Sequence, residues 1–207
     1  MLKLTIPTAL EQEFATVSVL WSTSAETRRV DALILSWTKY EKQLRRLFSF
    51  LLYQHPKIGS ENIEEFVGVL AANSQLYPET FISGIEELRV APVPVLIGPR
   101  YPELSADVER IKAYRNKLIH GQITGQKINS KRLEKDVILI IEWISCLADG
   151  AKAAFGYDGL GRNTFKAAKA DTPIAVGEYP FTSPAELEKW LDLLVKKLAK
   201  KRKSKVL

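Results

Sequence analysis

The stretch that decides the fold is SKRLEKDVILIIEWISCLADGAKAAF, residues 130–155. Apolar residues recur in it at the three- and four-residue spacing of an α-helix, so they form one continuous face. The members of that face are Leu133, Val137, Ile140, Ile141, Ile144, Leu147, Ala151 and Phe155. Ile138 and Trp143 widen the apolar arc, and an arc this wide is typical of a helix at the centre of a bundle or at a subunit interface.

Helical patterns continue on both sides of this stretch. A long amphipathic pattern over residues 24–54 ends before His55-Pro56, because proline pushes the preceding residue out of the α region. Ser105 is placed to begin a helix that runs to about His120, and Gly121 is placed to end it. Shorter helices are predicted at residues 8–21, 60–70 and 78–88, and a last one from Ser183 onward.

These patterns predict an all-α protein of the up-and-down helical-bundle type. Residues 1–155 would form the bundle, and residues 156–207 a loop-rich C-terminal extension that ends in a helix. The proline-rich residues 91–99 predict an extended connection, because proline is not tolerated in a helix interior. A short strand is predicted within the glycine-rich part of the extension, at residues 174–176.

The composition indicates an ordinary folded domain and excludes several kinds of site. The 207 residues are 46% hydrophobic and 26% charged, as in an ordinary folded domain. A single cysteine, Cys146, allows no intrachain disulfide and fits a reducing compartment, so we expect a cytoplasmic protein. One cysteine and two histidines cannot form a zinc site of the Cys/His kind within one chain, and we expect neither a metal nor a cofactor. No stretch reaches the ~20 apolar residues of a membrane span, so no membrane partner is expected.

The stretch with the clearest chemical content is Arg115-Asn116-Lys117-Leu118-Ile119-His120-Gly121. Asn116 and His120 are four residues apart and share a helix face. Arg115 lies beside or within the apolar stripe of the predicted helix, where an arginine needs a partner. Histidine exchanges protons near neutral pH, and arginine is a permanent planar cation suited to phosphate. These are the groups that RNA cleavage without a metal requires.

The arrangement resembles the R-x4-6-H motif of the HEPN superfamily, whose name abbreviates higher eukaryotes and prokaryotes nucleotide-binding. A long amphipathic helix precedes the motif helix in that family and a hydrophobic helix follows it, as residues 24–54, 105–120 and 131–155 would here. The stretch Ser36-Trp37-Thr38-Lys39-Tyr40-Glu41 also resembles the long helix of some members. The resemblance therefore covers roughly residues 24–155.

The resemblance implies a helical bundle that forms a homodimer with the two motifs near the subunit interface. Many members are metal-independent endoribonucleases, often toxins or anti-phage effectors, and an antitoxin protein is then a partner. Arg115 and His120 would be catalytic, Asn116 would occupy the polar position after the arginine, and Glu41 would contact the motif. The alternative is a HEPN-like module that binds nucleotide, RNA or a partner protein without catalysis.

A structural interpretation of the same residues stays open. Gly121 after a helix is ordinary carboxyl capping, and His120 can serve as a cation that interacts favourably with the helix dipole. On this interpretation the motif only contributes to packing.

The basic residues form the last functional feature. The net charge is +6, yet the seven Lys and Arg residues from Lys196 onward account for more than all of it, so the rest of the chain carries about −1. Such a segment either attracts RNA phosphates without sequence preference or is a solvated helix end. The predicted RNA-binding residues are Lys112, Lys117, Lys196, Lys197, Lys200, Lys201, Arg202 and Lys203.

Overall fold

The structure is a computed structural model that describes residues 3–25, 27–73, 75–122, 128–161, 169, 171–179 and 181–204, without the side chains of Asn62, Ile174, Arg202 and Lys203. Within these ranges every regular element is a helix and there is no strand, which confirms the predicted all-α class. The α-helices are α1 (Glu11–Ser22), α2 (Arg28–Tyr53), α3 (Ile63–Ala72), α4 (Pro78–Glu87), α5 (Val93–Ile97), α6 (Tyr101–Ile119), α7 (Ser130–Phe155), α8 (Asp171–Gly177) and α9 (Pro184–Ser204). The same described ranges also contain the short 3-10 helices η1 (Thr8–Leu10), η2 (Ser60–Asn62) and η3 (Gly98–Arg100).

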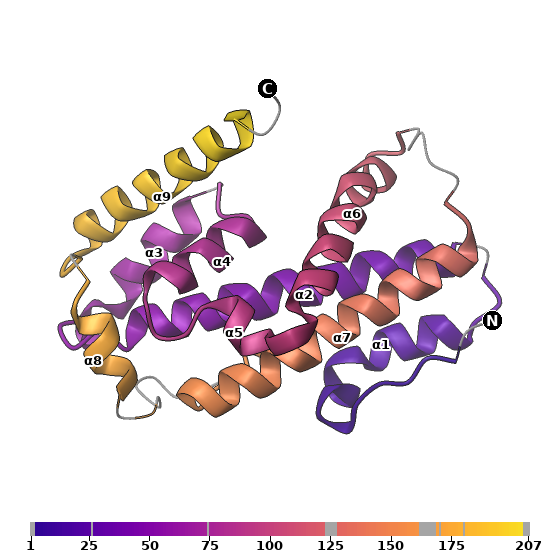
Figure 1. Ribbon diagram of the computed structural model, residues 1–207, viewed down its shortest axis with the longest axis horizontal. Coiled ribbons are helices and arrows are strands. Elements are labelled where there is room, and N and C mark those ends of the chain that lie inside the picture. Colours follow the sequence, from indigo (N-terminus) through magenta and orange to yellow (C-terminus); the bar gives the residue numbers. More distant parts are fainter. Residues whose placement is uncertain are drawn as a thin grey trace.

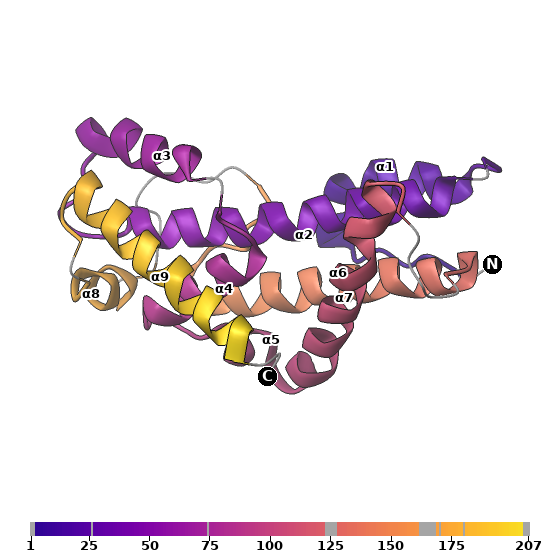
Figure 2. The same cartoon turned by 90° about the horizontal axis from the view of Figure 1, so that it is seen from above.

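The two longest helices, α2 and α7, run side by side through the middle of the molecule (Figures 1 and 2). They are parallel, since Arg29 pairs with Glu134 near their starts and the rings of Phe50 and Phe155 lie 6.2 Å apart near their ends. Each has 26 residues, and the predicted apolar face of α7 is buried along its whole length. This α2–α7 pair forms the centre of the core.

Two helices pack antiparallel to this pair. Helix α1 lies against α2 with Glu13 beside Lys39 and Lys42, while Trp21 at its end stacks on Arg29. Helix α6 crosses α7 with Arg100 paired to Glu142 and Arg110 to Asp136. Chain direction therefore alternates in the order α1, α2, α6, α7, with α3, α4 and α5 inserted between α2 and α6.

The remaining helices gather around the end of α2. Helix α9 packs against α3 and α4 (Figures 1 and 2). The ring of Trp190 stacks on Phe48 with centroids 6.0 Å apart. The predicted apolar face of α9 is buried at Leu187, Leu191 and Leu194. The first half of α9 is thus packed on α3 and α4.

Two sequence predictions about the connections are wrong. Residues 91–99 are not extended but contain α5 and the start of η3. Pro94 and Pro99 lie in the first turns of these short helices, where an amide hydrogen has no intrahelical partner to lose. Residues 174–176 are not a strand but part of α8, with Val176 fully buried.

Helix boundaries also differ by small amounts. Helix α6 begins at Tyr101 rather than Ser105, since Pro102 fits its first turn. The cap of α7 is Asn129, whose side-chain oxygen accepts a hydrogen bond from the Arg132 amide at 2.9 Å, and Ser130 is the first helical residue. Gly156 ends α7 in the left-handed conformation, with φ of 88°.

Candidate functional site

The predicted motif lies at the carboxyl end of α6, where this helix meets α2. Arg115 is half-buried, with 19% of its side chain exposed, so it sits at the edge of the apolar stripe. Its Nη2 donates to Glu41 Oε1 at 3.1 Å, and its Nη1 donates to Asn116 Oδ1 at 2.6 Å. The contact between Glu41 and the motif that the resemblance implies is therefore present.

Trp37 completes this cluster, and the sequence patterns gave it no role at the site. Its indole Nε1 donates to Glu41 Oε1 at 2.6 Å, one helical turn along α2. The guanidinium carbon of Arg115 lies 5.0 Å from the Trp37 ring centroid, a distance that allows a cation–π interaction. The four-residue spacing of an indole and a carboxylate on one helix is the signal in the sequence that could have identified it.

We call Trp37, Glu41, Arg115 and Asn116 the Arg115 cluster. The carboxylate accepts from both the indole and the guanidinium, so one oxygen of Glu41 fixes the positions of two other side chains. Because a planar guanidinium stacked on a ring retains its edge for hydrogen bonding, the cluster presents an oriented cation.

His120 lies apart from these contacts. It is the carboxyl cap of α6, its amide donates to the Asn116 carbonyl at 3.2 Å, and its side chain is exposed. Gly121 follows with φ of 62°, the left-handed conformation that glycine adopts without strain. The predicted position at a helix carboxyl end is confirmed, and the imidazole is accessible to a ligand.

A second cluster fixes the other face of α6. Asp136 on α7 is buried and accepts hydrogen bonds from Arg110 Nη2 at 2.7 Å and from the Tyr114 hydroxyl. Burial and the Asp136 carboxylate raise the pKa of Tyr114, so the phenol stays protonated as a donor. Held by α7 on one side and by Glu41 on the other, the last turns of α6 have a defined position.

The predicted RNA-binding residues on α6 differ in their surroundings. Lys112 forms an ion pair with Glu79 on α4, which already engages its charge. Lys117 is exposed in the last turn of α6.

The basic end of α9 remains helical to Ser204. Lys196, Lys200 and Lys201 are exposed, while Lys197 donates to Glu87 at 2.6 Å, a hydrogen bond that raises the pKa of Lys197. The side chains of Arg202 and Lys203 lie outside the described residues.

One pocket brings the two predicted groups of lysines together. It has a volume of about 460 Å³ between α4, α6 and α9, and it is lined by both Lys112 and Lys201. Glu79, Glu86 and Glu109 line it as well, so its described charged groups are mainly acidic. The basic end of α9 therefore lies beside Lys112 of α6. The carboxylates that line the same pocket make it unfavourable for RNA phosphates.

Two further findings concern metals and membranes. Among the described residues, no three His, Cys, Asp or Glu side chains lie together in a group that could hold a metal ion. Within those same residues, no helix is both long and apolar enough to cross a membrane.

No protein-family model, curated protein or solved structure matches this chain.

Proposed function

We propose that this chain is a HEPN-like endoribonuclease that cleaves RNA without a metal ion. The observation that carries the proposal is the oriented guanidinium of Arg115, fixed by Glu41 and Trp37, on the same helix as the exposed imidazole of His120. A fixed cation and an accessible proton-transfer group are the two functions that such cleavage needs. The homodimer and the antitoxin partner that the resemblance implies belong to this proposal.

The proposed reaction begins at a ribose 2′-hydroxyl. His120 takes the proton of that hydroxyl, and the 2′-oxygen attacks the adjacent phosphorus. The bond from phosphorus to the 5′-oxygen of the next nucleotide breaks, that oxygen takes up a proton from water, and a 2′,3′-cyclic phosphate remains on the attacked nucleotide. Arg115 stabilises the negative charge of the pentacoordinate phosphorane, and Asn116 holds the arginine in place.

The proposal needs Arg115 and His120 to reach one phosphodiester together. Five residues of helix separate them by about 7.5 Å along the axis and about 140° around it, so the proposal requires the arginine and the imidazole of the last turn to reach toward the same side of the helix end. Glu41 occupies one edge of the guanidinium in the free protein, so a substrate phosphate would compete with this carboxylate.

The test is cleavage of a single-stranded RNA in the presence of EDTA. Wild type is expected to cleave, while His120→Ala and Arg115→Ala should each lose at least roughly a hundredfold in rate, the usual scale of a general acid–base or electrostatic contribution. Arg100→Gln is the matched control, because Arg100 lies at the opposite end of α6 and pairs only with surface carboxylates. Equal rates for wild type and both motif variants would refute the proposal.

A second candidate is a non-catalytic module that binds RNA or nucleotide. It is favoured by one observation, the compensation of the Arg115 charge by Glu41. This candidate predicts that the protein retains labelled RNA on a filter but leaves it intact. His120→Ala would then have no effect on retention.

A further inference from the structure

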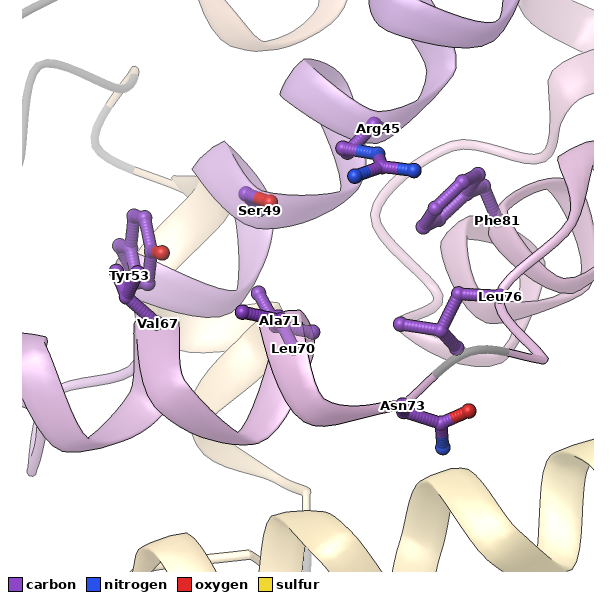
Figure 3. A pocket seen from close by; sticks show the side chains of 9 residues that line it. All are labelled: Arg45, Ser49, Tyr53, Val67, Leu70, Ala71, Asn73, Leu76 and Phe81. Atoms are coloured by element: carbon purple, nitrogen blue, oxygen red, sulfur yellow. The ribbon is translucent and has the colours of Figure 1, made fainter.

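A pocket unrelated to the motif lies between α2, α3 and α4. It has a volume of about 340 Å³, which is within the ordinary range for small-molecule sites. Figure 3 shows its lining side chains arranged around a central space, with α2 on one side and α3 on the other. Arg45 is the only charged residue among the described residues that line it.

The α2 wall carries all of the pocket's strong hydrogen-bonding groups except one amide. Arg45, Ser49 and Tyr53 are spaced by four residues, so they form a single stripe along the helix. Figure 3 shows the hydroxyl of Tyr53 and the side chain of Ser49 on the pocket side of α2. Burial raises the pKa of Tyr53, so its hydroxyl remains a donor at neutral pH.

The guanidinium of Arg45 is the group in this pocket that could bind an anion. Its guanidinium carbon lies 5.6 Å from the centroid of the Phe81 ring, which orients the group at the pocket. No carboxylate among the described residues forms an ion pair with it, in contrast to Arg29, Arg110 and Arg115. Charge complementarity at this pocket therefore favours a negative ligand group.

The wall of the pocket that α3 forms is apolar and partly exposed to solvent. Val67, Leu70 and Ala71 of α3 line it, and Val67 is 48% exposed. Phe66 is the one described residue of α3 that is buried, and the pocket-lining side chains of Val67, Leu70 and Ala71 are incompletely covered. Apolar side chains gathered around a concave site are typical of a ligand-binding wall.

We propose that this pocket binds a small amphipathic carboxylate, with its apolar body against α3 and its carboxylate on Arg45. Arginine suits this role because its fork of N–H donors matches the two oxygens of a carboxylate. The hydroxyls of Ser49 and Tyr53 then serve as further donors along the α2 wall. The site is independent of the Arg115 cluster, so its test does not depend on ribonuclease activity.

The experiment is isothermal titration calorimetry of the full chain with octanoate, and with octan-1-ol as the neutral ligand of equal chain length. Octanoate is expected to bind wild type more tightly than octan-1-ol. Arg45→Gln should weaken octanoate binding roughly tenfold or more, the effect of losing a hydrogen bond to a charged group, and should leave the alcohol unchanged. Ala71→Phe, at an exposed position, should fill the pocket and abolish binding of both ligands.

Arg46→Gln is the matched control, because Arg46 neighbours Arg45 on α2 but does not line the pocket. Circular dichroism of each variant checks that the helices are retained. Absence of octanoate binding to wild type would overturn the proposal. It would also be overturned if octanoate and octan-1-ol bound equally well, or if Arg46→Gln weakened binding as much as Arg45→Gln.

Discussion

Arg29 and Glu134 form an ion pair in the protein interior, with 3% and 7% of their side chains exposed. The two charged atoms lie 2.7 Å apart, and Arg29 also donates to the Trp21 carbonyl at 3.2 Å and stacks over the Trp21 ring. This single arginine therefore joins the end of α1 to the starts of α2 and α7. Buried charges remain charged only when they are paired in this way.

We predict that Glu134→Leu lowers the free energy of unfolding by about 3–5 kcal/mol, because it leaves the Arg29 charge buried without its carboxylate. The double variant Arg29→Met with Glu134→Leu should recover most of this loss, since an apolar pair of similar volume avoids the desolvation penalty. Urea unfolding followed by circular dichroism measures both.

The control is the surface pair Arg100–Glu142, whose side chains are 46% and 36% exposed. Glu142→Leu should cost no more than about 1 kcal/mol, the ordinary scale of an exposed ion pair. Equal costs at the two pairs would contradict the importance assigned to burial.

The sequence patterns could predict some of these pairings between charged residues. The position of Arg115 beside an apolar stripe correctly indicates that it needs a partner, and Glu41 is that partner. The burial of Glu134 and Asp136 could not be predicted, because both lie at the edges of the apolar arc of α7, where the pattern alone does not decide whether a carboxylate is covered. Their partners include Arg29 and Arg110, which are 105 and 26 residues away in sequence.

At the scale of elements, α5 lies unusually close to α7. A Cβ atom added to Gly150 would collide with the carbonyl oxygen, carbonyl carbon and Cα of Leu96. These are backbone atoms, which cannot move aside as a flexible side chain can. Gly150 is therefore required in the middle of α7, despite the low helix propensity of glycine.

We predict that Gly150→Ala destabilises the protein by about 1–3 kcal/mol, because α5 must shift away from α7 to admit the methyl group. Thermal unfolding followed by circular dichroism gives the change in Tm. Gly68 in α3 is the matched control, since an added Cβ there meets no atom within 4 Å. Gly68→Ala should stabilise by about 0.5–1 kcal/mol through helix propensity alone. A neutral effect of Gly150→Ala would show that α5 can move freely.

The sequence predicted the long helices better than the conformation of the segments that connect them. Periodicity placed α2, α6, α7 and α9 within a few residues, because long apolar stripes are strong signals. The proline-rich residues 91–99 and the Val176 segment were misassigned, since five- and seven-residue helices are too short to show a period. Their apolar residues Val93 and Val176 are buried, so packing against neighbouring helices stabilises the short helices.

At the scale of the whole molecule, charge and core are separated along α9. The first half of this helix contributes Leu187, Trp190 and Leu191 to the core, whereas Lys196, Lys200 and Lys201 project from its second half. The apolar spacing predicted that the first half docks, but nothing local could identify α3 and α4 as the surface that receives it. The basic surplus of the chain is therefore concentrated from Lys196 onward rather than spread over a broad face.

The last prediction concerns this distribution and rests on the proposed function. Replacing Lys196, Lys200 and Lys201 with Gln should weaken retention of single-stranded RNA and reduce its salt dependence, by up to roughly 0.7 in the logarithmic slope for each lost phosphate contact. A variant with Lys57, Lys131 and Lys152 replaced by Gln changes the net charge equally at exposed positions elsewhere. If the end of α9 acts as a local electrostatic site, filter binding over a range of salt concentrations will separate the two variants. Equal weakening would instead show that only the total charge matters, and an unchanged affinity in both would assign RNA contact to Arg115 and its surroundings alone.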